Sequence, residues 1–158
     1  MACEYLANQI QTVALNNPIV FYDSIPCRRG RIYHEDGTGV FQLRGLSNLC
    51  GCGCQRTTDY QVTFNGNIAI PEGGTVGPIA IALALSGEPI DSSRAILTPA
   101  AVDEYGNVTV TKIIKIPWGC CPSVSVEYVN GSVDDPTFVP TPTINVINGN
   151  LTITPVNE

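Results

Sequence analysis

The sequence predicts an all-β domain, built as a sandwich or barrel, from two observations. Apolar residues alternate with polar or small residues in several segments, and this period of two is typical of a β-strand. Signals for helices are nearly absent, whereas 15 glycines and 12 prolines divide the 158 residues into short segments. A chain of this length is expected to form a single domain with a substantial core.

The longest alternating segment spans residues 60–70, where apolar side chains recur at every second position and Gly66 keeps the register. Asn65-Gly66 is also a strong hairpin signal, but a turn there would break the alternation. We therefore expect one long strand, with Gly66 at a place where a neighbouring segment approaches closely.

Residues 79–85 predict a strand that is covered on both sides. Large side chains point to one face and only alanines to the other; the large ones are Ile79, Ile81, Leu83 and Leu85, and the alanines are Ala80, Ala82 and Ala84. The alanine face requires a close neighbour. In so small a chain, that neighbour can be another copy of the chain itself.

The remaining elements are expected to be short strands. They are residues 19–22, 31–33, 40–43, 95–97, 108–116 and 123–129. Glu35–Gly39 is interpreted as a hairpin loop. Asn148-Gly149 predicts a hairpin at the end of the chain, pairing Val146 with Leu151 and Ile144 with Ile153.

Charge and composition exclude some partners. The net charge is −6 and the only basic cluster is Arg28, Arg29 and Arg31, which argues against nucleic acid because phosphate binding needs clustered Lys and Arg. Charged residues make up only 14%, below the ~25% of ordinary globular domains. Part of the surface is therefore expected to be covered by other copies. Neither a signal peptide nor a membrane-spanning run is visible, so we expect no membrane partner.

The order of strands and turns resembles the tumour necrosis factor/complement globular-head superfamily, with bacterial and phage relatives. The resemblance covers roughly residues 10–156 and rests on segments 40–43, 60–64, 77–83, 87–90 and 113–118. It implies a ten-stranded antiparallel jelly-roll sandwich that forms a compact homotrimer. In that family the inner sheet packs near the three-fold axis, which implies a trimer interface containing Tyr60, Val62, Ala80, Ala82 and Ala84.

Two parts of the chain depart from a plain jelly roll. Residues 1–17 are expected to be an N-terminal segment that anchors the protein to a partner, and residues 18–158 the domain. An insertion at residues 46–59 carries the run Cys50-Gly51-Cys52-Gly53-Cys54 where the family has a short turn.

The seven cysteines leave three interpretations open: disulfides, a metal site, or free thiols. An odd number cannot pair fully within one chain. The candidates are Cys50, Cys52, Cys54, Cys120 and Cys121, for example a disulfide between the insertion and Cys120 or Cys121. Tetrahedral zinc more often uses a C-x₂-C spacing than C-x-C-x-C.

Residues for catalysis are not expected. His34 is the only histidine and is predicted to lie in a surface loop, and no phosphate-binding loop or cofactor motif is present. The sequence therefore favours a non-catalytic structural trimer without cofactors. The expected setting is a tailed-phage virion, as a head fibre, decoration or receptor-contact protein, with a host-surface glycan or protein as a further expected partner. Alternatives are a bacterial surface or spore-associated binding module, and a metal- or redox-active cysteine-rich protein.

Overall fold

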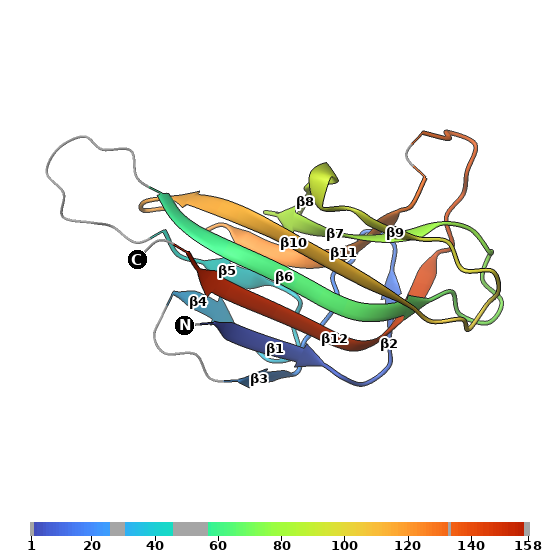
Figure 1. Ribbon diagram of the computed structural model, residues 1–158, viewed down its shortest axis with the longest axis horizontal. Helices are drawn as coiled ribbons and strands as arrows, with labels where there is room; N and C mark the ends of the chain where they lie inside the picture. Colours follow the sequence, from blue (N-terminus) through green and yellow to red (C-terminus); the bar gives the residue numbers. More distant parts are fainter. Residues whose placement is uncertain (1, 26–30, 46–56, 133, 157–158) are drawn as a thin grey trace, which may run out of the picture.

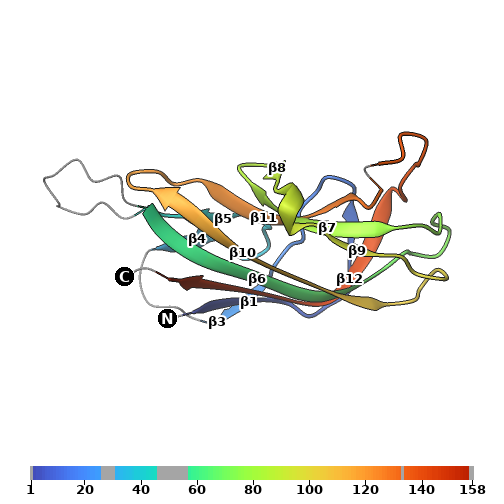
Figure 2. The same ribbon diagram turned by 45° about the horizontal axis from the view of Figure 1, so that its top comes forward.

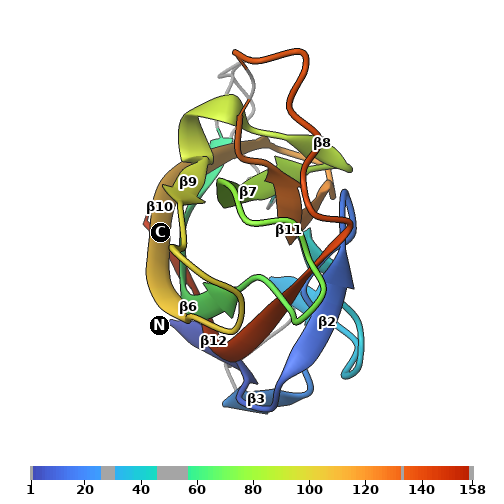
Figure 3. The same cartoon turned by 90° about the vertical axis from the view of Figure 1, so that its right-hand side faces the viewer.

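The computed structural model describes residues 2–25, 31–45, 57–132 and 134–156. Two six-stranded antiparallel sheets face each other, as the view along the molecule in Figure 3 shows. This arrangement confirms the predicted all-β sandwich, with twelve strands in the described residues where ten were expected. The shortest of them has only two residues. None of the helices in these residues is long and apolar enough to span a bilayer.

The first sheet has the order β10-β6-β12-β1-β3, and β2 also pairs with β12. Its strands are β1 (Cys3–Ala7), β2 (Gln11–Ala14), β3 (Asp23–Ile25), β6 (Thr57–Ala69), β10 (Gly106–Pro117) and β12 (Thr143–Pro155). The three longest strands, β6, β10 and β12, lie side by side along the molecule (Figures 1 and 2).

The second sheet has the order β4-β5-β11-β7-β8, and β9 also pairs with β7. Its strands are β4 (Ile32–His34), β5 (Phe41–Leu43), β7 (Ile79–Leu85), β8 (Glu88–Pro89), β9 (Ala95–Leu97) and β11 (Ser123–Asn130). A single 3₁₀ turn, η1 (Asp91–Ser93), connects β8 to β9 along the edge of β7. The expected hairpin around residues 35–39 is confirmed, since β4 pairs with β5.

One apolar core lies between the sheets. Every second residue of the long strands points into it, including Tyr60, Val62 and Phe64 of β6 and Ile79, Ile81 and Leu83 of β7. Because the side chains of a strand alternate between its two faces, the residues between these point away from the core. The outward faces of the two sheets are therefore the surfaces on which function is built.

Asn65-Gly66 lies within β6, as predicted. The strand pairs continuously with β10, with Gly66 opposite Val108. A Cβ on Gly66 would lie 2.7 Å from Cζ of the buried Phe64 ring and 3.4 Å from Cα of Gly149. The glycine is therefore required by a close approach.

The predicted C-terminal hairpin at Asn148-Gly149 is wrong. β12 continues through these residues, and Ile147 pairs with Asn67 while Asn150 pairs with Asn65. The extra residue on β12 makes a β-bulge, with Asn148 at a φ of 55°. The bulge exchanges the faces of odd and even positions, so residues 144, 146, 151 and 153 all still reach the core.

Residues 1–17 differ from the expected separate anchor. Within this segment, β1 pairs with β12 and β3, and β2 pairs with β12. Cys3, Tyr5 and Ala7 are buried in the core. The segment is therefore part of the sandwich, and its proposed contact with a partner is limited to its outward side.

Candidate ligand-binding surface

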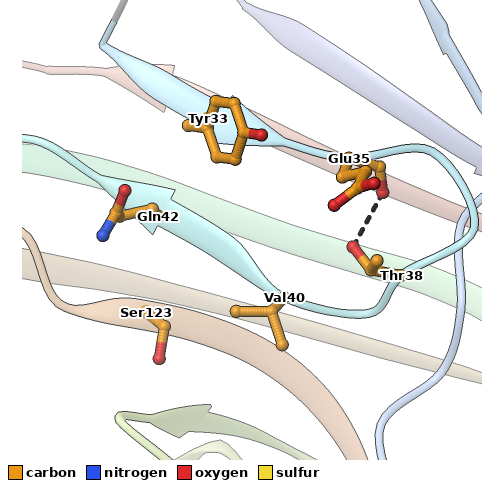
Figure 4. A pocket seen from close by; sticks show the side chains of 6 residues that line it. All are labelled: Tyr33, Glu35, Thr38, Val40, Gln42 and Ser123. Atoms are coloured by element: carbon orange, nitrogen blue, oxygen red, sulfur yellow. Dashed lines mark hydrogen bonds between the residues drawn. The ribbon is translucent and has the colours of Figure 1, made fainter.

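A hollow of about 300 Å³ lies on the outward face of the second sheet. Tyr33 of β4 pairs with Gln42 of β5, and Gln42 pairs with Ser123 of β11, so the three side chains form a row across three strands. Figure 4 shows them with the other lining residues, Glu35, Thr38 and Val40. Because side chains alternate along a strand, this row lies on the outward face of the sheet, whereas the neighbouring Phe41 is buried on the inward face.

The β4–β5 loop that closes one end of the hollow is tied to the sandwich. Thr38 donates from its backbone N–H and from its hydroxyl to the carbonyl oxygen of Glu35, at 3.1 and 2.7 Å. Phe21 and the loop exchange two backbone hydrogen bonds, from Phe21 N to Thr38 O and from Gly37 N to Phe21 O. The loop therefore presents Glu35 and Thr38 in fixed positions.

His34 lies beneath this loop, and the prediction of a surface histidine is wrong. Its side chain is only 2% exposed. The ring stacks on Phe41 at a centroid distance of 4.2 Å and meets the edge of Tyr5 at 5.1 Å. Its Nε2 is 3.0 Å from the carbonyl oxygen of Thr38. In the sequence, His34 alternates with Tyr33, so only one of the two can face solvent.

The five residues expected at a trimer interface do not form one surface. Tyr60 and Val62 lie in the core of the sandwich, with no exposed side-chain surface. The Tyr60 hydroxyl donates to the carbonyl oxygen of Arg44 at 2.5 Å, and its pKa is raised, mainly by burial. The alanines of β7 lie in the other sheet and point outward.

The alanine face has a neighbour within the same chain. In β9, Ala95 and Leu97 pack against the core and Ile96 points outward opposite Ala80. Arg94 precedes this strand and alternates onto the same outward face as Ile96. Its guanidinium donates to the carbonyl oxygen of Asn130, on the far side of β7.

The Arg94 side chain therefore crosses β7 at Ala80 and Ala82, and it is only 12% exposed. Ala80, Ala82 and Val129 form a small buried cluster on this face. The small side chains leave room for the long one. Contact of this face with another copy stays a prediction, but another copy is not needed to cover it.

Amide and hydroxyl side chains predominate on the outward face of the first sheet, which also carries Asp59, Ile113 and Lys115. We call the amide and hydroxyl residues the Asn–Thr face; they are Thr63, Asn65, Asn67, Asn107, Thr109, Thr111, Asn145, Asn150, Thr152 and Thr154. Its members bond to one another across strands. Asn107 donates to Asn65 at 2.6 Å, and the hydroxyls of Thr63 and Thr111 are 3.2 Å apart.

Cys120 and Cys121 are exposed free thiols in the turn between β10 and β11. The disulfide considered between them and the insertion stays a prediction, because its other cysteine lies outside the described residues. Gly45 donates to the carbonyl oxygen of Cys120 at 2.8 Å, which holds this turn beside the start of the insertion. Cys3 is in a disulfide.

The predicted sites at Cys50, Cys52 and Cys54 lie outside the described residues. Within the described ranges, no cluster of three or more His, Cys, Asp or Glu side chains is placed to hold a metal ion. The metal and redox interpretations therefore stay predictions.

Sequence reasoning missed the hollow around Tyr33. The signal was present, because the predicted hairpin between residues 31–33 and 40–43 already placed Tyr33 near Gln42. The contribution of Ser123 depends on the pairing of β5 with β11, which joins segments about eighty residues apart and has no local signature.

Comparison with known proteins gives a fold but no sequence relative. No protein-family model matches the chain, and no curated protein matches it. The globular domain of a zebrafish complement 1qA protein is similar in structure, with a TM-score of 0.54, 15% identity and coverage of 94% of both chains. Eiger TNF from S. frugiperda is also similar, with a TM-score of 0.65, 9% identity and coverage of 100% of this chain and 93% of that one. The chain thus has the jelly-roll fold of the tumour necrosis factor and complement C1q proteins.

Proposed function

We propose that the protein is a non-catalytic binding and structural module that works as a homotrimer on the surface of a particle. The observation that carries the proposal is the fold, which extends over nearly the whole chain. The family resemblance of the sequence implies trimers. The environment of His34 also fits a non-catalytic role, because its ring is packed between aromatic side chains beneath a loop.

The setting that we propose is a tailed-phage virion, where the protein serves as a head fibre, decoration or receptor-contact protein. The low content of charged residues, 14%, fits a chain that buries part of its surface in an assembly. The outward side of residues 1–17 is the proposed contact with other virion proteins. A bacterial surface or spore-associated binding module of the same fold is the second candidate, supported by the same fold.

For the contact between copies we propose the Asn–Thr face. Its ten residues extend over the three longest strands and carry no charge, and interface cores are depleted of charged residues. Asp59 and Lys115 lie opposite each other on the same side, at one end of β6 and β10. The alanine face is the weaker candidate because Arg94 already lies over it.

Sedimentation equilibrium at micromolar concentration tests the assembly. The expected mass is three times the 16.8 kDa of one chain. Thr111→Arg places a charge on the Asn–Thr face and is expected to reduce the mass to that of one chain. Ile96→Arg is the matched control, since Ile96 is an exposed strand residue on the other sheet, and it should leave the trimer intact.

A monomeric wild-type protein would contradict the trimer. A trimer that tolerates Thr111→Arg would contradict the proposed face alone.

Gold-labelled antibody on purified virions tests the setting, with label on the particles expected. Label restricted to the host cell surface would favour the bacterial alternative. Metal analysis of the purified protein tests the cysteine-rich alternative, and a stoichiometric metal would support it.

A further inference from the structure

We propose that the hollow around Tyr33 binds a neutral carbohydrate. The inference names a ligand class for the binding module proposed above and rests on that function. Four kinds of evidence carry it: an exposed aromatic ring, free hydrogen-bonding groups beside it, the charge of the lining, and its size and support.

Tyr33 supplies the aromatic surface. Its side chain is 59% exposed on β4, which ends the strand order of the second sheet among the described residues. The face of an aromatic ring carries partial negative charge and attracts polarised C–H groups. One face of a pyranose ring is a patch of such C–H groups, whereas its rim carries hydroxyls. The exposed Val40 extends the apolar part of the hollow.

Gln42 and Ser123 supply hydrogen bonds in the same row. The Gln42 amide makes one long contact, 3.5 Å to the carbonyl oxygen of Cys121, which leaves its own oxygen and a further N–H open. The Ser123 hydroxyl has no partner among the described residues. An amide and a hydroxyl can both donate and accept, which is what the hydroxyls of a sugar require.

Glu35 sets the charge of the hollow. It is the one ionisable carboxylate among the six lining residues that the structure describes, and none of these six is a cation. A carboxylate accepts hydrogen bonds from sugar hydroxyls but repels carboxylated, sulfated or phosphorylated ligands. The lining therefore favours neutral sugars over acidic ones.

The number of carboxylates also separates binding from hydrolysis. Glycoside hydrolysis generally uses a pair of carboxyl groups on opposite sides of the bond that breaks. The described lining provides one, so we expect the sugar to be bound and not cleaved.

Size and rigidity complete the argument. A volume of about 300 Å³ is at the lower end of the range for small-molecule sites. It suits a single sugar ring or the end of an oligosaccharide. The lining side chains stand on three paired strands and on a loop held by Phe21, so little ordering is needed on binding.

The test uses a glycan array of neutral and of sialylated or sulfated oligosaccharides, followed by calorimetric titration of the strongest neutral glycan. We expect neutral glycans to bind in preference to acidic ones. Tyr33→Ala should weaken binding by about tenfold or more, because it removes the stacking surface. Tyr22→Ala is the matched control, since Tyr22 is 53% exposed and lies outside the lining, and its affinity should match the wild type.

Glu35→Gln tells a neutral sugar from a cationic ligand, which Tyr33 and Glu35 would also attract. A neutral sugar should lose no more than about threefold, because the amide keeps a hydrogen-bonding oxygen. The inference is overturned if no neutral glycan binds, if Tyr33→Ala binds as well as the wild type, or if Glu35→Gln abolishes binding.

Sedimentation of the same samples keeps the two proposals separate. A trimer that binds no glycan would remove the ligand class alone. A monomer that binds neutral glycans would remove the proposed assembly and leave the sugar site standing.

Discussion

The outward face of the first sheet is polar and bonded to itself, whereas the outward face of β7 is apolar and lies under a side chain of its own chain. On the Asn–Thr face, Asn107 donates to the side-chain oxygens of Asn65 and Asn67, at 2.6 and 3.3 Å, and the Thr109 hydroxyl also donates to Asn65, at 3.3 Å. On β7, Arg94 crosses Ala80 and Ala82 to reach Asn130. The strands of the first sheet and β7 alternate in a similar way. The result is an open polar surface on the Asn–Thr face and a closed apolar surface on β7.

This difference shows that small residues on one face of a strand do not predict which group packs against that face. Alanines make room for close packing, and the packing partner can be a symmetry mate or a long side chain from an adjacent strand. Here the nearest available cover is Arg94, held by the 3₁₀ turn at the edge of β7.

The largest expected effect is that of Ala82→Arg. Ala82 has no exposed surface and pairs with the buried Glu127 of β11. A long charged side chain at this position must therefore displace its neighbours. We expect a loss of about 3 kcal/mol or more in the free energy of unfolding, from overpacking and a buried charge. Urea unfolding measures it.

Thr111→Arg is the control on the open face, and in the isolated chain its effect should stay within about 0.5 kcal/mol. If Ala82→Arg left the unfolding free energy unchanged and only dissociated the assembly, the alanine face would be an interface and not a closed layer.

Arg94→Ala tests the cover directly. It removes the hydrogen bond to the carbonyl oxygen of Asn130 in β11 and uncovers the apolar surface of β7, for an expected cost of about 1–3 kcal/mol. Asp91 is the other partner of the guanidinium, at 3.0 Å, but its side chain is 90% exposed. Asp91→Ala should therefore cost below about 1 kcal/mol. Equal losses in the two variants would mean that Arg94 acts through the surface ion pair and not as a cover.

The long strands were predictable because their alternation is a local property. The continuity of β6 through Asn65-Gly66 followed from the register of its apolar residues. The same reasoning failed at Asn148-Gly149. The apolar residues have even numbers before this point, at 144 and 146, and odd numbers after it, at 151 and 153. A hairpin and a β-bulge both keep residues 144, 146, 151 and 153 on one face, and only the pairing with β6 decides between them.

The surface features were less predictable because they depend on contacts between distant segments. The burial of His34 requires Tyr5 and Phe41 to lie around it. The cover of Ala82 requires Arg94 to reach Asn130, thirty-six residues away. The sequence pattern indicated which face of each strand was outward, but not what would lie on it.

Asn107→Ala tests whether the Asn–Thr face is a stabilising network in the single chain. The substitution removes the donor that joins Asn65, Asn67 and the carbonyl oxygen of Gly66. The two amide oxygens are in exposed contacts and can bond to water, whereas the Gly66 carbonyl oxygen is part-buried, so the expected loss is about 0.5–1 kcal/mol by thermal or urea unfolding. Thr154→Ala on the same face is the control, with a smaller loss expected. A loss above about 2 kcal/mol in the unfolding free energy would show that the hydrogen bonds of this face stabilise the single chain as much as the packing of the alanine face does.

The smallest expected effect concerns Glu127, the buried acid opposite Ala82 on the closed face. Burial raises its pKa above the ordinary value of 4.5, and nearby Glu88 adds to the rise, while a hydrogen bond from Ser125 opposes it. Between 4.5 and the raised pKa the folded chain binds more protons than the unfolded chain. Its stability therefore falls as pH rises through that window and stays lower above it.

Glu127→Gln removes this titration and should make the variant relatively more stable at neutral pH than at acid pH. The measurement is the difference in unfolding free energy between the two proteins across the acid-to-neutral range, which cancels the titration of the shared carboxylates. Glu72→Gln, at an exposed position in the turn before β7, is the matched control for the change from Glu to Gln. A flat difference for Glu127→Gln would mean that water reaches the carboxylate, and that the closed face is open at this position.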